Sequence, residues 1–542
     1  MHNAQYGFSD ETGHPVEGNA AISPRWRFCV AIVLAGGLAA RIYQAYSYFL
    51  DPDEALHTLL ASYGSAVLTF QATLTTAHPP LLIFLLHYWR WLGQSEFVLR
   101  LPSILAGTLS CWLICLWLRK VTDDSTAFVG LLLCTFCPAL IELSAQVRQY
   151  AILNLFIAAC LYCSERAVQD DSPVFMHLFS LSLCGAVLTH YSAFLFAFSM
   201  GVYLLVRMRP WNERFGVVAS WAIGQIVVAA VCAFFLLVHI PRLKQAGMPQ
   251  GIAETWLRKS IYHAEDTSLL LFPARQTLRV FTYIFSHGLI GTLALLIFIA
   301  GYVLLLKRKH MGNQRPSPRE LSLLIGLPFV LNCGLAIAGK YPYGGTRHDV
   351  YLAFFAIAGI AVGLSWWRPK AAAWKIGVLA LALAVCNLFP APPPLIRASN
   401  HRKALMADAV ALLKNSAPPG SILFTDYQSG LLLGYYLCHQ GVVQVFVPLE
   451  PFAMKNCGDY AIIAPSPQQW QFEAGELTPA LHEATQRFPL VPGTAVWLVE
   501  AGWMPKKPAE VTTELSNLGC KPRYFGSNIR FCAITIGNNL EK

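Results

Sequence analysis

The chain has 542 residues, of which 55% are hydrophobic and only 13% charged, and its mean hydropathy is +0.47. A soluble globular protein carries about 25% charged residues, so this composition excludes an ordinary soluble domain and predicts an integral membrane protein. The net charge of +10 does not indicate nucleic-acid binding, because much of it lies in short loops between apolar runs.

The chain begins with a polar segment rich in Gly, Pro and acidic residues, which predicts a disordered cytoplasmic tail over residues 1–25. Residues 26–390 then carry about 11 apolar runs long enough to cross a bilayer, which predicts a mainly α-helical, polytopic bundle. The runs cover residues 28–50, 101–118, 125–143, 150–165, 174–189, 192–206, 215–239, 279–306, 320–339, 349–367 and 371–389.

Segment 78–92 is apolar but short, and His87 and Arg90 interrupt it beside Trp89 and Trp91. This pattern is typical of a helix that lies in the membrane interface. With this segment not spanning, the Lys and Arg clusters fall on the same side as the N-terminus, as the positive-inside rule requires. We therefore expect a cytoplasmic N-terminus and a periplasmic or extracellular C-terminal region. The sequence contains no Asn-X-Ser/Thr glycosylation site, which favours a bacterial source and hence the bacterial inner membrane.

Residues 391–542 differ in composition from the bundle and predict a soluble α/β domain. A Pro-rich linker at 391–394 precedes helical patterns at 401–415, 476–488 and 508–518, which alternate with short apolar strands at 421–425, 443–447, 460–464, 494–500 and 529–535. Cys438, Cys457, Cys520 and Cys532 lie here and could form disulfides in an oxidising compartment, although their pairing is open.

The predicted topology places the chemically interesting polar residues on the outer face. They comprise the stretch from Asp51 to His57, His78, Gln146, Arg148, Tyr150, His190, Tyr191, the long loop 240–277, and the loop from Lys340 to His348. Polar groups that gather at one mouth of a helical bundle predict a site open to the outer interface.

The stretch Asp51-Pro52-Asp53-Glu54 has two interpretations. Asp51 suits a helix N-cap, Pro52 suits the first helical position, and Glu54 suits a capping box, so the motif could merely start a helix. Capping leaves Asp53 and His57 unused, four residues apart on one helical face. These two groups are therefore available for chemistry.

Sugar transfer outside the cytoplasm needs few groups. A polyprenyl-phosphate sugar is the expected donor, a carboxylate can take the proton of the acceptor hydroxyl, and cations can meet the charge of the leaving phosphate. Asp53 is the predicted base, with Glu54 orienting it or helping to hold a divalent metal ion. The predicted donor-phosphate ligands are Arg148, Lys340, Arg347, His348 and His78, and the predicted supporting residues are Asp51, His57, Gln146, Tyr150, His190 and Tyr191.

Several of these residues also have ordinary structural explanations. Arg148 could be a snorkelling arginine paired with Glu142, and the basic loop with Lys340 could bind anionic lipid headgroups. His78 could simply end a helix, and Tyr191 could belong to the interfacial aromatic belt. Only the tertiary structure can decide between these alternatives.

The sequence resembles a known family. The Asp-Glu pair after the first span, His78-Pro79-Pro80-Leu81, the stretch from Ser95 to Ser103, the stretch from Ser144 to Tyr150 and the Arg347-His348 loop resemble the family 39-type glycosyltransferases. These belong to the GT-C superfamily, with protein O-mannosyltransferases and the lipid A aminoarabinose transferase as relatives. The resemblance spans roughly residues 28–370.

The resemblance implies inverting transfer from a polyprenyl- or dolichyl-phosphate sugar, with Asp53 as the base and short juxtamembrane helices after the first span. The aminoarabinose transferases have Lys at the position of His78, and the predicted α/β tail is unlike the β-trefoil of eukaryotic O-mannosyltransferases. The acceptor, whether glycan, lipid or protein, therefore stays open. The alternatives are a secondary transporter or lipid flippase with a site at the outer mouth, and an inactive scaffold.

Overall fold

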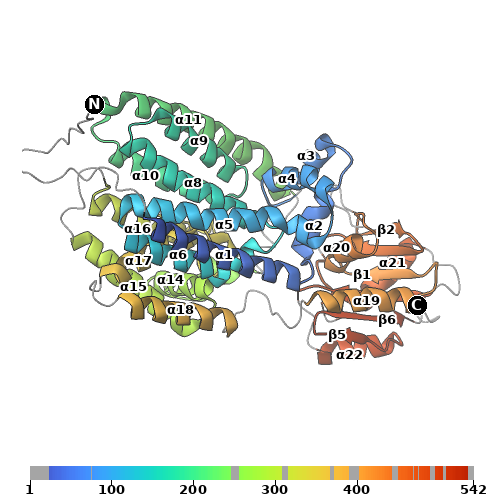
Figure 1. The fold of residues 1–542 in the computed structure, drawn as a ribbon. Helices are drawn as coiled ribbons and strands as arrows, with labels where there is room; N and C mark the ends of the chain where they lie inside the picture. The colour runs from blue at the N-terminus through green and yellow to red at the C-terminus, as the bar shows by residue number, and fades with distance from the viewer. Residues whose placement is uncertain are drawn as a thin grey trace, which may run out of the picture.

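The computed structural model describes residues 23–74, 76–245, 256–307, 315–366, 372–389, 402–441, 450–467, 469–473, 475–488, 495–503 and 508–534. The predicted tail lies outside these residues up to residue 22, as do the Pro-rich linker and the predicted strand 443–447. The described chain forms a helical bundle with a sheet-containing part at one end (Figure 1).

The bundle contains the helices α1 (Pro24–Ser47), α5 (Glu96–Val121), α6 (Asp124–Phe136), α7 (Pro138–Ser144), α8 (Gln149–Gln169), α9 (Pro173–Val187), α10 (Ser192–Arg207), α11 (Phe215–Phe234), α14 (Leu271–Phe285), α15 (Gly288–Lys307), α16 (Pro318–Ile337), α17 (Leu352–Trp366) and α18 (Ala372–Leu388). Helix α5 packs against α6 and α8, and α8 packs against α9. Their buried faces form one apolar cluster that includes Trp117, Leu153, Phe179 and Phe354.

Six of the described helices are long and apolar enough to cross a membrane, or seven if α6 and α7 form one span bent by 55°. The bend falls at Pro138, which lacks a backbone N–H. Helices α9, α10, α17 and α18 are apolar but shorter, so the predicted count of about 11 spans stays a prediction. The predicted span 279–306 is wrong as one element, because Ser286 takes a left-handed conformation that ends α14 before α15 begins.

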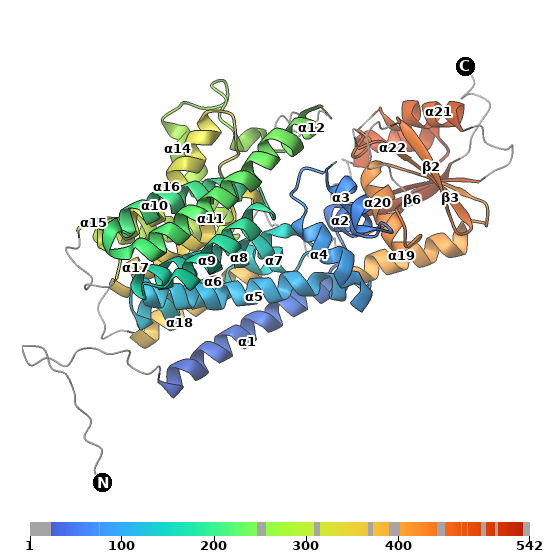
Figure 2. The ribbon, with the colours of Figure 1, turned by 90° about the horizontal axis from the view of Figure 1, so that it is seen from above.

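Short helices follow α1, as the sequence predicted: α2 (Pro52–Ala61), α3 (Ala66–Thr73), α4 (Leu81–Trp89) and η1 (Arg90–Leu92). They lie between the bundle and the sheet in both views (Figures 1 and 2). Further short elements are η2 (Trp211–Arg214), η3 (Phe235–His239), α12 (Ile240–Gln245), η4 (Arg258–Ser260) and η5 (Arg347–Asp349).

The C-terminal part is a six-stranded mixed sheet with the strand order β2-β3-β1-β4-β6-β5. The strands are β1 (Ile422–Thr425), β2 (Phe452–Cys457), β3 (Tyr460–Pro465), β4 (Val496–Ala501), β5 (Arg523–Phe525) and β6 (Ile529–Ile534). Strand β1 pairs in parallel with β3 and β4, and the other pairings are antiparallel. The helices are α19 (Lys403–Ser416), α20 (Tyr427–Tyr436), α21 (Leu477–Arg487) and α22 (Pro508–Asn517).

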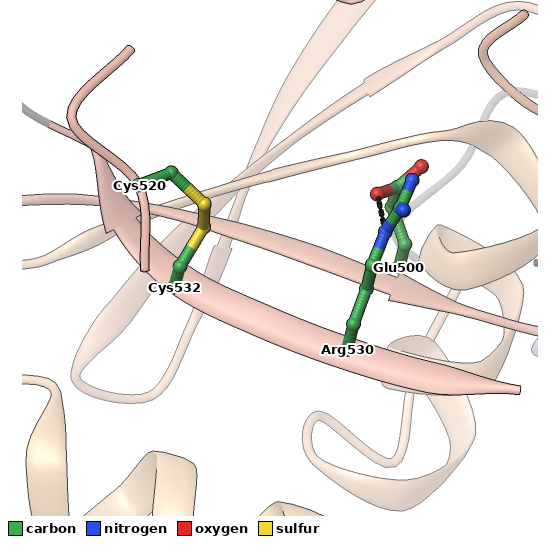
Figure 3. The surroundings of a disulfide bond; sticks show 4 residues. All are labelled: Glu500, Cys520, Arg530 and Cys532. Carbon is green, nitrogen blue, oxygen red and sulfur yellow. Dashed lines mark hydrogen bonds and ion pairs between the residues drawn. A yellow bond between two sulfur atoms is a disulfide. The ribbon is translucent and has the colours of Figure 1, made fainter. Parts of the chain in front are cut away.

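The four cysteines of this part pair as Cys438–Cys457 and Cys520–Cys532, with Cα–Cα distances of 5.0 and 5.5 Å. The second disulfide joins β6 to the turn before β5, and an ion pair between Arg530 and Glu500 ties β6 to β4 (Figure 3). The sequence had left this pairing open.

Helix α2 is held from two sides. Its residues Ala55 and Leu59 share an apolar cluster with Leu431 of α20, and its residue Leu60 shares another with Leu82 of α4. Apolar burial on both sides fixes the orientation of α2, which carries Asp53.

Candidate functional site

The start of α2 confirms the structural interpretation of its first acids. The Asp51 side chain accepts a hydrogen bond of 2.9 Å from the Glu54 backbone N–H, and Glu54 accepts one of 2.9 Å from the Asp51 N–H. Pro52 occupies the first turn. Asp51 therefore serves as the helix cap, and Asp53 takes no part in the capping.

Glu54 is fully buried and pairs with Arg100 rather than with Asp53. The Arg100 guanidinium donates to both Glu54 carboxylate oxygens, with distances of 2.8 and 2.7 Å, and the Val147 N–H donates to Oε1 at 2.7 Å. Arg100 also donates to the carbonyls of Ala45, Tyr48 and Phe49 at the end of α1. Glu54 therefore acts on Asp53 by fixing α2 against α1, α5 and the turn before α8.

Asp53 lies between two arginines that are distant in sequence. Arg347 Nη2 lies 2.8 Å from Asp53 Oδ2, and Arg148 Nη1 forms a second ion pair with the same oxygen. The Asp53 side chain is 13% exposed, and no described residue forms a hydrogen bond or ion pair with its Oδ1. The carboxylate thus has one oxygen held by cations and one oxygen available.

Arg148 immediately precedes α8 and is fully buried, so it is not the snorkelling arginine that the sequence also allowed. Its guanidinium lies 5.6 Å from the centre of the Tyr150 ring, and its Nε has no hydrogen-bond partner among the described residues. Burial lowers the pKa of Arg148 to about 10, with a further contribution from the nearby Arg347 charge. Arg148 remains a cation at neutral pH, with donor capacity to spare.

Arg347 comes from the loop after α16, and Asp349 shapes that loop. Asp349 accepts hydrogen bonds from the Gly344 N–H at 2.9 Å and from the Thr346 hydroxyl at 3.2 Å. Burial raises the pKa of the Asp349 carboxyl well above its usual value. Lys340, at the start of the same loop, is exposed, and no described contact joins it to Asp53.

Four histidines form a row beside the two arginines. Ring centres lie 5.6 Å apart for His57 and His78, 6.1 Å for His78 and His190, and 5.7 Å for His190 and His348. Burial lowers the pKa of all four, to about 4 for His57 and about 3 for His190. At neutral pH the row is therefore uncharged, and His78 and His348 could offer a phosphate only neutral hydrogen bonds.

The remaining predicted residues divide into two groups. Tyr150 belongs to the cluster, since its ring lies 5.3 Å from His190 and 6.3 Å from His348. Gln146 instead donates to Glu142 at 3.4 Å. Tyr191 turns away and hydrogen-bonds His239 at 2.6 Å, which in turn contacts the Thr73 carbonyl.

No role was predicted for Arg100, Asp349 or Gln149, which all support the cluster. Gln149 contacts His78 at 3.1 Å. A buried ion pair could have been suspected for Arg100, which lies one residue before the predicted span 101–118. No local pattern shows that Asp349 folds back on Gly344.

Divalent metal binding near Asp53 and Glu54 is not supported by the arrangement of this pair. Both Glu54 oxygens already accept from Arg100, and Asp53 Oδ2 is held by two guanidinium groups. No group of three or more His, Cys, Asp or Glu residues within the described ranges is arranged to hold a metal ion. The metal ion stays a prediction.

Part of the chain matches a known protein family. Residues 77–236 match the family described as dolichyl-phosphate-mannose-protein mannosyltransferase. No curated protein sequence matches the chain. The matched segment includes His78, Arg148 and His190, and it ends within η3, just after α11.

Comparison of folds covers nearly the whole chain. ArnT from Cupriavidus metallidurans in the apo state superposes with a TM-score of 0.55 and 13% identity, covering 94% of this chain and 98% of that one. The same protein bound to undecaprenyl phosphate gives a TM-score of 0.52, with the same identity and coverage. The chain therefore has the GT-C fold seen in ArnT, and over residues 77–236 its resemblance to the mannosyltransferase family is confirmed.

Proposed function

We propose that this chain, with its GT-C fold, is a membrane glycosyltransferase that moves a sugar from a polyprenyl-phosphate donor to a hydroxyl acceptor. The observation that carries the proposal is the contact of Asp53 with both Arg148 and Arg347, three residues that lie far apart in the sequence. A carboxylate and two phosphate-binding cations in one partly enclosed place form the minimal set for this reaction.

In the proposed step, the acceptor hydroxyl attacks the anomeric carbon and gives its proton to Asp53. A new C–O bond forms while the bond between the anomeric carbon and the phosphate oxygen breaks, and the electron pair leaves with the phosphate. Asp53 Oδ1, which carries no described contact, suits the acceptor hydroxyl. Attack from the side opposite the phosphate inverts the configuration at the anomeric carbon.

Arg148 and Arg347 would bind the donor phosphate and meet the charge that develops on it. A planar guanidinium binds phosphate oxygens in pairs, and burial strengthens each contact. The known binding of undecaprenyl phosphate by ArnT, a protein of the same fold, supports this class of donor. When phosphate engages the arginines, it competes with Asp53 Oδ2 and so releases the base for the acceptor.

The position of the site argues for transfer rather than transport. Asp53 lies in a short helix, Arg148 just before α8, and Arg347 in the loop after α16, so all three lie at helix ends. Substrate sites of secondary transporters lie near the bilayer midplane, often at broken helices. The cluster fits an enzyme working at one face of the membrane.

We further propose that this face is the periplasmic or extracellular one. The C-terminal part, which contacts α2, contains two disulfides, and disulfides persist in oxidising compartments. The positive-inside rule, applied to the predicted spans, gives a cytoplasmic N-terminus. We propose the bacterial inner membrane as the location.

The test is the variant Asp53→Asn in cells that otherwise lack the protein. We expect transfer to fall by about 100-fold or more, because general-base catalysis contributes on that scale. Mass spectrometry of lipid-linked sugars and envelope glycans would then show the donor accumulating and the product missing. Asp124→Asn, at an exposed ion pair with Arg119, is the matched control. Normal product in Asp53→Asn at equal protein level would remove Asp53 from the mechanism.

A further inference from the structure

Three tryptophans from distant segments meet beside the proposed transfer site. The ring centre of Trp256 lies 5.8 Å from that of Trp470 and 5.9 Å from that of Trp503, and the latter two are 6.0 Å apart. Trp256 belongs to the loop between α12 and α14, whereas Trp470 and Trp503 belong to the C-terminal part. We call these three residues the tryptophan cluster.

The cluster lies at a particular edge of the sheet. Strands β3 and β4 both run parallel to β1, so their carboxyl ends lie at one edge. Trp470 follows the end of β3 at Pro465, and Trp503 follows the end of β4 at Ala501. In open α/β sheets, ligands bind outside the carboxyl ends of the parallel strands.

Polar groups frame the tryptophans at this edge. The Gln428 side-chain oxygen accepts a hydrogen bond of 3.3 Å from the backbone N–H of Trp503. The Gln428 side-chain nitrogen lies 3.5 Å from the Gln471 side-chain oxygen. Gly502 has a φ of +149°, and a Cβ there would collide with the Gln428 amide, so only glycine lets the chain pass here. The Gln469 side-chain oxygen is buried with no described partner.

The cluster touches the proposed catalytic residues through one contact. The Arg347 guanidinium lies 5.3 Å from the centre of the Trp503 ring, and the same guanidinium pairs with Asp53 at 2.8 Å. Arg347 therefore links Trp503 directly to the proposed base. A ligand on the cluster would lie next to the reacting groups.

Packing between the two parts does not by itself account for the cluster. The C-terminal part is anchored elsewhere: the Tyr436 hydroxyl accepts from the Leu50 N–H at 2.6 Å, the Tyr435 hydroxyl donates to the Gln94 carbonyl at 2.7 Å, and Lys403 pairs with Glu96 at 2.6 Å. Trp256 is 54% exposed, and Trp470 and Trp503 are partly exposed. Indole surface left open to solvent is what a ligand would cover.

We infer that the tryptophan cluster binds a sugar ring of the acceptor, so that the acceptor is a saccharide-bearing molecule. The C–H faces of a pyranose carry partial positive charge and pack against the negative faces of indoles, while its hydroxyls need amide partners such as the partly exposed Gln471 side chain. This inference rests on the proposed function and adds the chemical class of its acceptor. The C-terminal part then contributes acceptor specificity.

The experiment uses the full chain in detergent, fluorescently labelled, on an array of immobilised mono- and oligosaccharides, with undecaprenyl phosphate binding measured in parallel. We expect the wild type to bind a subset of the saccharides. Trp256→Ala and Trp470→Ala should bind them about tenfold more weakly, as lost aromatic stacking predicts, while undecaprenyl phosphate binding stays unchanged. Trp211→Ala, which removes an indole that is 47% exposed elsewhere, is the matched control and should bind saccharides normally.

Two results would overturn the inference: a wild type that binds undecaprenyl phosphate but no saccharide, and Trp256 and Trp470 variants that bind saccharides as tightly as the wild type. Trp256→Phe keeps an aromatic ring for packing and should restore part of the binding, whereas a purely structural role would restore all of it. Saccharide binding without undecaprenyl phosphate binding would support the cluster and overturn the proposed donor.

Discussion

Asp53 and Glu54 are neighbours in the chain, yet the fold uses them differently. Successive helical positions point about 100° apart, so Glu54 turns into the protein towards Arg100 while Asp53 turns to the partly open cluster. The helix cap fixes the start of α2, and the Glu54–Arg100 pair fixes its place. The helix that carries Asp53 is thereby positioned by groups that do not themselves contact the substrate.

Removing one partner of the buried pair should destabilise the protein. We expect Arg100→Met to cost about 3–5 kcal/mol, because it leaves the Glu54 carboxylate buried without its cation. The double variant Arg100→Met with Glu54→Gln should recover much of that loss. Thermal unfolding in detergent measures both, and equal stability of the single and double variants would contradict the assignment.

The two arginines should act mainly on the donor. Arg347→Ala should weaken undecaprenyl phosphate binding by about 10- to 100-fold, as expected for a lost charge-assisted hydrogen bond of about 1.5–3 kcal/mol. Lys340→Ala, in the same loop but exposed, is the matched control and should bind normally. If Arg347→Ala binds the donor normally but transfers the sugar slowly, then Arg347 does not act in donor binding.

At the scale of elements, the site is built where helix ends and loops converge. Helix α2 supplies Asp53 and His57, the turn before α8 supplies Arg148, and the loop after α16 supplies Arg347 and His348. The predicted loop 240–277 contributes Trp256, although residues 246–255 lie outside the described chain and residues 271–277 belong to α14.

The histidine row predicts a loss of stability in acid. The pKa of His57 is about 4 in the folded protein, against an ordinary value of 6.5, because burial disfavours the charged imidazole. As pH falls below 6.5, the unfolded chain takes up the proton first, so stability falls from pH 6.5 down to about pH 4. His57 alone contributes up to about 3 kcal/mol to this loss.

The groups that face His57 include Asp51, which favours its protonation, and Arg347, which opposes it. His57→Gln should flatten the decline of thermal stability between pH 7 and pH 5, while His482→Gln, on α21 and away from the row, should leave the decline as it is. An unchanged decline in His57→Gln would show that other groups cause it.

At the scale of the whole molecule, the disulfides offer a test of orientation. Under the proposed topology, Cys438, Cys457, Cys520 and Cys532 face outward, whereas the remaining described cysteines lie in the helical part. Intact cells treated with a membrane-impermeant reductant should then accept a membrane-impermeant thiol label. A chain with these four cysteines replaced by serine is the control, and labelling only after cell lysis would reverse the proposed orientation.

Much of the architecture was predictable from local patterns. Apolar runs predicted most helices of the bundle, the capping box at Asp51 predicted the start of α2, and short apolar stretches predicted the strands β1, β3, β4 and β6. Strands β2 and β5 were not predicted. Local patterns failed where burial rather than sequence order decides, as at α20, a helix that the sequence did not predict and that is almost entirely buried. They also missed the break at Ser286, although the polar, Gly-containing stretch Ser286-His287-Gly288 interrupts the apolar run there.

The sequence by itself determined a membrane-embedded helical protein with acidic and cationic residues near the ends of its apolar runs, because hydropathy and residue type are local properties. Only the tertiary structure decided that Arg148 and Arg347 converge on Asp53, that Arg100 occupies Glu54, and that Trp503 covers Arg347. These contacts join residues separated by up to several hundred positions. They are set by how helices and sheet pack, which no short stretch of sequence encodes.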